Sequence, residues 1–140
     1  MHRVLVVCSL LGIALLGPAC ASADRLTVAE YADLCADGIA SARNLIEPES
    51  VTWGDLIRLG EPSLERLRSV EPPEALAEFH SASIRTLDFV IGVAEEQPAE
   101  ETANPLAFGL SAVRIATQLS RAIDGLEPTT RATLRRAGCL

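Results

Sequence analysis

Four successive segments of this chain place apolar residues three or four positions apart, and prolines separate the segments. This spacing gathers apolar side chains on one face of an α-helix, which has 3.6 residues per turn. The first such stripe consists of Val28, Ala32, Cys35, Ile39, Ala42 and Ile46. No run alternates at period two for long enough to predict a strand. The sequence therefore predicts an all-α fold.

Capping residues and prolines set the boundaries of the expected helices. Thr27 with Glu30, and Thr52 with Asp55, have the spacing of helix-capping pairs. Asn104 precedes a proline and is expected to cap a further helix. The expected helices cover about 27–45, 52–71, 73–97, 105–124 and 128–137. Long helices joined by short loops favour antiparallel neighbours, so we expect an up-down-up-down four-helix bundle with a short C-terminal fifth helix.

Pro62 falls inside the second expected helix. Proline lacks the backbone N–H and its ring clashes with the preceding turn. We therefore expect a kink or a break near Gly60.

The composition limits both the core and the partners. Apolar residues make up 49% of the chain but aromatic residues only 4%, so Ala, Leu, Ile and Val must fill the core. The net charge is −7, all cationic side chains other than histidine are arginines, and no basic cluster occurs. Nucleic acids demand a positive surface, so this class of partner is not expected.

The first 23 residues are typical of a secretory signal peptide. Arg3 is followed by the apolar run Val4–Leu16, which is too short to span a bilayer comfortably, and then by a helix-breaking Gly-Pro pair. Small residues in Ala21-Ser22-Ala23 predict cleavage before Asp24, leaving a single domain over 24–140 that is secreted, periplasmic or held in the cell envelope. Two alternatives stay open: a lipid anchor on Cys20, the one route by which we expect contact with a membrane, or an ordinary buried N-terminal helix.

Two cysteines remain in the mature chain, Cys35 and Cys139. An even pair in an oxidising compartment favours a disulfide. The bundle topology agrees, because the fifth helix would bring Cys139 to nearly the height of Cys35 on the first helix. The alternative is two separately buried free thiols. A thiol nucleophile is not expected, because burial opposes formation of the thiolate.

His80 and Trp53 are the weak candidates for a functional site. His80 is the only histidine of the mature chain and is expected at the edge of the core, hydrogen-bonded locally; a general base beside a carboxylate is the sharper alternative. Trp53 is expected to anchor the core at one end of the bundle, with ligand stacking as the alternative.

No motif in the sequence carries a recognisable chemistry. Metal-ligand spacings, the phosphate-binding glycine loop and the nucleophilic-serine elbow are all missing, so no metal, cofactor or catalytic residue is predicted. The acidic loop 95–101 lacks the spacing of a Ca²⁺ site and is expected to be solvated.

Short sequence features resemble those of small exported bacterial helical proteins of unassigned function. They are T-W-G near the second helix, P-P-E-A-L-A-E-F-H at the third, N-P at the fourth and G-C at the end. The resemblance covers roughly 27–139 and implies no activity, since these features are mostly helix caps and starts.

The sequence favours a non-enzymatic binding or interaction module outside the cytoplasm, with an unknown protein or small-molecule partner. Two alternatives remain, and each requires a different structural feature. A carrier of a small apolar ligand requires a pocket lined by the inner stripes. An enzyme requires a cleft with His80 near a carboxylate. A filled core with an exposed apolar patch would instead indicate a protein partner.

Overall fold

The protein is all-α in the residues that its structure, a computed structural model, describes: 25–45 and 51–140. The α-helices are α1 (Val28–Leu45), α2 (Trp53–Ser69), α3 (Ala77–Glu95), α4 (Gly109–Asp124) and α5 (Pro128–Arg136). Short 3₁₀ segments, η1 (Glu74–Leu76) and η2 (Pro105–Phe108), precede α3 and α4. The expected signal peptide 1–23 and the lipidation candidate Cys20 lie outside the described residues.

Both predicted capping boxes form. Thr27 donates its backbone N–H to the Glu30 carboxylate at 2.8 Å, and the Glu30 N–H returns a bond to the Thr27 hydroxyl at 3.3 Å. Thr52 and Asp55 make the same reciprocal pair at the start of α2. Each pair satisfies N–H groups that have no partner within the helix, which fixes where α1 and α2 begin.

Of the kink or break expected near Gly60, the break does not occur. α2 runs without interruption from Trp53 to Ser69 and contains Pro62 in its interior. Gly60 and Leu64, on either side of the proline, are buried. Proline costs about 3 kcal/mol inside a helix, so the continuity of α2 depends on its packing against the rest of the molecule.

The third and fourth expected helices are each divided into a 3₁₀ turn and an α-helix, η1 followed by α3 and η2 followed by α4. In the fourth, the Asn104 side chain accepts a hydrogen bond from the Leu106 N–H at 2.9 Å and caps η2. Gly109 then adopts φ 55°, a value that L side chains rarely allow. The chain therefore changes direction between η2 and the first turn of α4.

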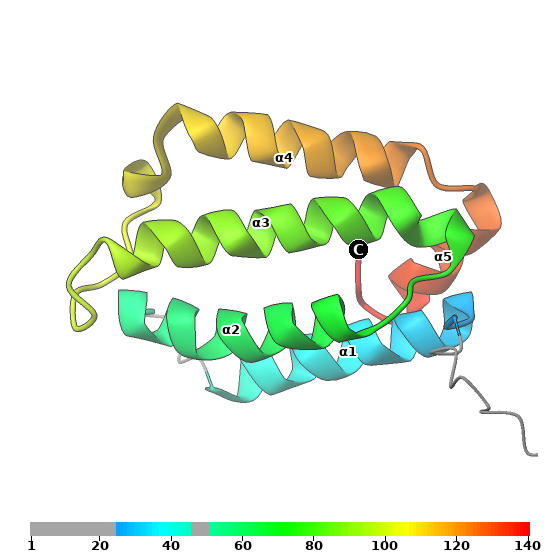
Figure 1. Ribbon diagram of the computed structural model, residues 1–140, viewed down its shortest axis with the longest axis horizontal. Helices are drawn as coiled ribbons and strands as arrows, with labels where there is room; N and C mark the ends of the chain where they lie inside the picture. Colours follow the sequence, from blue (N-terminus) through cyan, green and yellow to red (C-terminus); the bar gives the residue numbers. More distant parts are fainter. Residues whose placement is uncertain (1–24, 46–50) are drawn as a thin grey trace, which may run out of the picture.

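α3 occupies the centre of the molecule, with α2 on one side and α4 on the other (Figure 1). α1 packs mainly on α5, which returns along the end of the molecule. The main core lies where these elements converge, and consists of Tyr31, Ala32, Leu76, Phe79, Ala82, Ala122, Leu126 and Leu134. As a result, one long side of α4 faces no other helix.

The connection between α3 and α4 is tied to the start of α2. Trp53 donates its N–H to the Glu101 carbonyl at 3.0 Å, and Gly54 donates to the Ala99 carbonyl at 2.9 Å. The Ala103 N–H reaches the Val51 carbonyl at 2.7 Å. These backbone bonds hold the acidic loop and η2 at a defined position beside α2.

The described helices were compared in length and apolar character with what a membrane span needs. None of them has both the length and the apolar character that crossing a bilayer requires.

Candidate functional site

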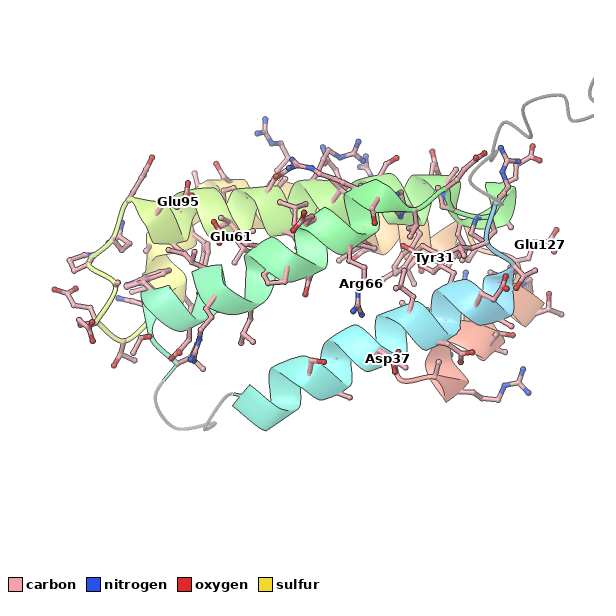
Figure 2. The ribbon with its side chains drawn as sticks, turned by 60° about the horizontal axis from the view of Figure 1, so that its bottom comes forward. Tyr31, Asp37, Glu61, Arg66, Glu95 and Glu127 are labelled. Atoms are coloured by element: carbon pink, nitrogen blue, oxygen red, sulfur yellow. The ribbon has the colours of Figure 1, made fainter. Side chains whose placement is uncertain are left out.

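His80 is buried beside Tyr31 of α1, a residue that the sequence analysis did not single out. The Tyr31 hydroxyl and His80 Nδ1 share a hydrogen bond of 3.1 Å. The two rings meet edge to face with centroids 5.7 Å apart, and Tyr31 makes a similar contact with Phe79. Figure 2 shows the Tyr31 side chain directed from α1 toward the other helices. The pair is therefore a polar link inside the core, between α1 and α3.

Burial controls the protonation of this pair. Desolvation lowers the pKa of His80 below its usual 6.5, so the ring is neutral at neutral pH. Burial also raises the pKa of the Tyr31 phenol, which stays protonated. Among the described residues, no carboxylate hydrogen-bonds to His80, whose partner is a phenol. The arrangement orients two neutral groups, and it lacks the acid–base pairing that the enzyme hypothesis requires.

Cys35 and Cys139 lie next to each other, but the structure records both as free cysteines instead of the expected disulfide. Cys139 Sγ donates a hydrogen bond to the Ala32 carbonyl at 3.4 Å, one turn of α1 before Cys35. Burial, together with the neighbouring Cys139 thiol, raises the pKa of Cys35 to about 12. A thiol with so high a pKa is a poor nucleophile at neutral pH. The two residues are placed for pairing with each other, so the disulfide stays a prediction.

Trp53 takes the place of a core anchor. Its side chain is 2% exposed, and its ring lies 5.6 Å from that of Phe108, which in turn lies 5.9 Å from that of Phe89. This aromatic cluster joins the start of α2 to α3 and to the end of η2. Ligand stacking would require an open ring face, which so buried an indole does not offer.

An open groove of about 340 Å³ runs between α3 and α4. Its walls carry three charged side chains and one polar side chain, from Glu78 and Arg85 of α3 and Gln118 and Arg121 of α4, together with Ala122 of α4. Ala122 is the one residue of the inner apolar stripes among them. The groove therefore suits a charged group better than the small apolar ligand of the carrier hypothesis.

Three large aliphatic side chains are exposed close together in the chain, at η2 and the first half of α4. Leu106 is 84% exposed, Leu110 89% and Val113 63%. Leu110 and Val113 are three residues apart on the helix and so lie on one face. We call these three residues the α4 patch.

The α4 patch was not predicted from the sequence. The inner face of α4 contains Ala112, Ile115, Leu119 and Ala122, all of them buried or half-buried. A signal was present, because two leucines and a valine lie outside that inner series. A helix with apolar residues on both faces does not reveal from sequence which face is covered.

No three histidine, cysteine or acidic side chains within the described residues are grouped so that they could hold a metal ion.

Comparisons of the chain with protein-family models, with curated proteins and with solved structures gave no match. The α4 patch, the adjoining groove and the two buried polar pairs are therefore interpreted from their own geometry.

Proposed function

We propose that the mature protein is a non-enzymatic interaction module outside the cytoplasm, a four-helix bundle in up-down-up-down order that docks a protein partner on α4. The α4 patch is the observation that carries this proposal. Each square ångström of apolar surface kept in water costs about 25 cal/mol. Grouped exposed aliphatic side chains are therefore typical of a surface that another molecule covers.

The rest of the molecule supports binding by a surface more than binding in an interior site. Leu76 and Leu134 are 0% exposed and Tyr31 is 1% exposed, so the convergence of the helices is filled by side chains. Charged and polar residues make up most of the lining of the groove between α3 and α4, and His80 is engaged by Tyr31. These features favour a protein partner over the carrier and the enzyme.

Export is the second part of the proposal, and it rests on the leader described by Arg3, Val4–Leu16 and Ala21-Ser22-Ala23. Intact-mass spectrometry of protein expressed with its leader in a bacterial host tests it directly. We expect a mature chain that begins at Asp24. A diacylglyceryl adduct on Cys20 would replace soluble release by a lipid anchor, and an uncleaved chain would contradict export.

Site-specific photo-crosslinking in intact cells tests the docking surface. A photoreactive amino acid replaces Leu110 in one variant and Glu65, an exposed residue of α2, in the control. We expect one discrete heterologous adduct from position 110 and none from position 65. Adducts of equal yield at both positions, or none at either, would contradict docking on α4.

A further inference from the structure

The groove between α3 and α4 has two arginines in its walls, Arg85 and Arg121, and both are exposed. Within the described part of the chain, neither guanidinium lies within 4.0 Å of a carboxylate oxygen, whereas Arg25, Arg58 and Arg68 do. Glu78 lines the same groove but is not ion-paired with either arginine. The groove therefore presents cationic groups to the solvent in a chain whose net charge is −7.

The cationic side of the groove continues along α4 to the α4 patch. Arg114, Gln118 and Arg121 are spaced by four and three residues, which places them on one side of the helix. Arg114 is exposed and four residues after Leu110, so its position adjoins the patch. Residues 102–123 contain these two arginines and no acidic residue. One surface thus combines exposed aliphatic groups with an edge of arginines.

We infer that this surface recognises an acidic protein segment, with aliphatic side chains that cover the α4 patch and carboxylates that bind Arg85, Arg114 and Arg121. This inference rests on the proposed function and names the chemistry of its partner. A guanidinium presents a planar fork of donors that matches a carboxylate with two parallel hydrogen bonds. Charge complementarity of this kind sets partner choice and speeds encounter more than it adds affinity.

The charges around this surface argue against two other partners, a second copy of the protein and an anionic lipid membrane. A symmetric contact of α4 with α4 of a second copy would bring the arginines of one copy toward those of the other, and like charges in an interface are costly. An anionic lipid surface that met Leu106 would also meet the exposed glutamates of the loop leading to it; these are Glu95, Glu96, Glu100 and Glu101. A protein segment can follow the arginine edge and avoid that loop.

Two designed helical peptides test the inference against the full mature protein. Both carry leucine along one face, and their flanking positions hold glutamate in the first and glutamine in the second. Binding is measured by fluorescence anisotropy at 50 mM and 500 mM NaCl. We expect the glutamate peptide to bind at least tenfold more tightly than the glutamine peptide at low salt, and this advantage to shrink at high salt.

Arginine variants test whether the glutamate peptide binds at the groove between α3 and α4. Arg85→Gln combined with Arg121→Gln should reduce binding of the glutamate peptide about tenfold, and the control pair Arg66→Gln with Arg135→Gln, on α2 and α5, should leave it unchanged. Arg66 and Arg135 are exposed like the tested pair, and neither makes an ion pair with a described residue.

The outcomes separate the inference from the proposed function. If Leu110→Asp abolishes binding while the Arg85/Arg121 variant keeps it, the patch docks a partner and the acidic chemistry is wrong. If neither change weakens binding, or if no peptide binds, the inference fails, and crosslinking at position 110 still judges the proposed function separately. Tighter binding to phosphatidylglycerol vesicles than to the glutamate peptide, or a dimer that Leu110→Asp dissociates, would also overturn it.

Discussion

Substituting Gly60 by alanine tests the close approach of α2 to α3. A Cβ atom at this position would lie 2.8 Å from Ile91 Cγ1 and 3.0 Å from Ile91 Cδ1. Ile91 is 6% exposed and buried between the helices, so it has little room to move. Overpacking of this kind costs about 1–3 kcal/mol. Alanine in place of glycine inside a helix gains about 1 kcal/mol, so the net change at Gly60 is expected to be unfavourable.

A matched control isolates the steric part of this effect. Gly92 in α3 and Gly38 in α1 are helical glycines at which a new Cβ would meet nothing within 4 Å. Their alanine variants should therefore stabilise the protein by up to about 1 kcal/mol. Because the helix-propensity gain is common to all three, the free energies of unfolding of Gly60→Ala and Gly92→Ala should differ by about 1–3 kcal/mol.

The assay is urea unfolding followed by far-ultraviolet circular dichroism. Introducing Gly60→Ala into an Ile91→Ala background should remove its penalty, because the clashing atoms are then absent, and a double-mutant cycle measures this coupling. The reasoning is refuted if Gly60→Ala stabilises the wild-type chain as much as Gly92→Ala does.

Three further predictions concern the buried polar groups. Tyr31→Phe leaves His80 Nδ1 without its partner and should cost about 1–3 kcal/mol in urea unfolding, whereas Tyr31→Phe with His80→Leu should cost less than the two single changes added together. Because burial lowers the pKa of His80, the unfolded chain takes up a proton below pH of about 6.5 that the folded chain excludes. The free energy of unfolding should therefore fall as the pH drops below that value and level off beneath the pKa of His80 in the folded protein. His80→Gln should flatten this slope. Oxidation of Cys35 and Cys139 by glutathione disulfide should close a loop of about 105 residues and add up to about 4–5 kcal/mol, less any strain, to the free energy of unfolding. Non-reducing peptide mapping, with Cys139→Ser as the control, checks this pairing. Alkylation of both thiols in the oxidised protein would contradict it.

Local chemistry explains which parts of the fold were predictable from the sequence. The capping boxes at Thr27 and Thr52 were predicted because their partners, Glu30 and Asp55, lie three residues away in the chain. The break expected near Gly60 does not occur for the complementary reason: the penalty of Pro62 is local, whereas the packing that keeps α2 continuous, with Gly60 and Leu64 buried, is tertiary.

The candidate site was less predictable than the fold. The neighbourhood of Cys35 and Cys139 followed from topology, and the free thiols show that proximity does not establish a bond. Tyr31 was missed, although its spacing from Val28 and Cys35 continues the inner stripe of α1. The sequence did not show which apolar face of α4 is buried and which is exposed, because this depends on where the other helices pack.

The affinity of the crosslinked partner for α4 variants tests the account most directly. The partner identified from position 110 would be purified and titrated by isothermal calorimetry against wild-type protein, Leu110→Asp and the α2 control Glu65→Ala. Burying a leucine side chain is worth about 1.5–3 kcal/mol, so we expect Leu110→Asp to raise Kd at least tenfold without changing the urea midpoint, and Glu65→Ala to leave Kd unchanged. A Kd for Leu110→Asp within threefold of wild type would contradict docking on the α4 patch.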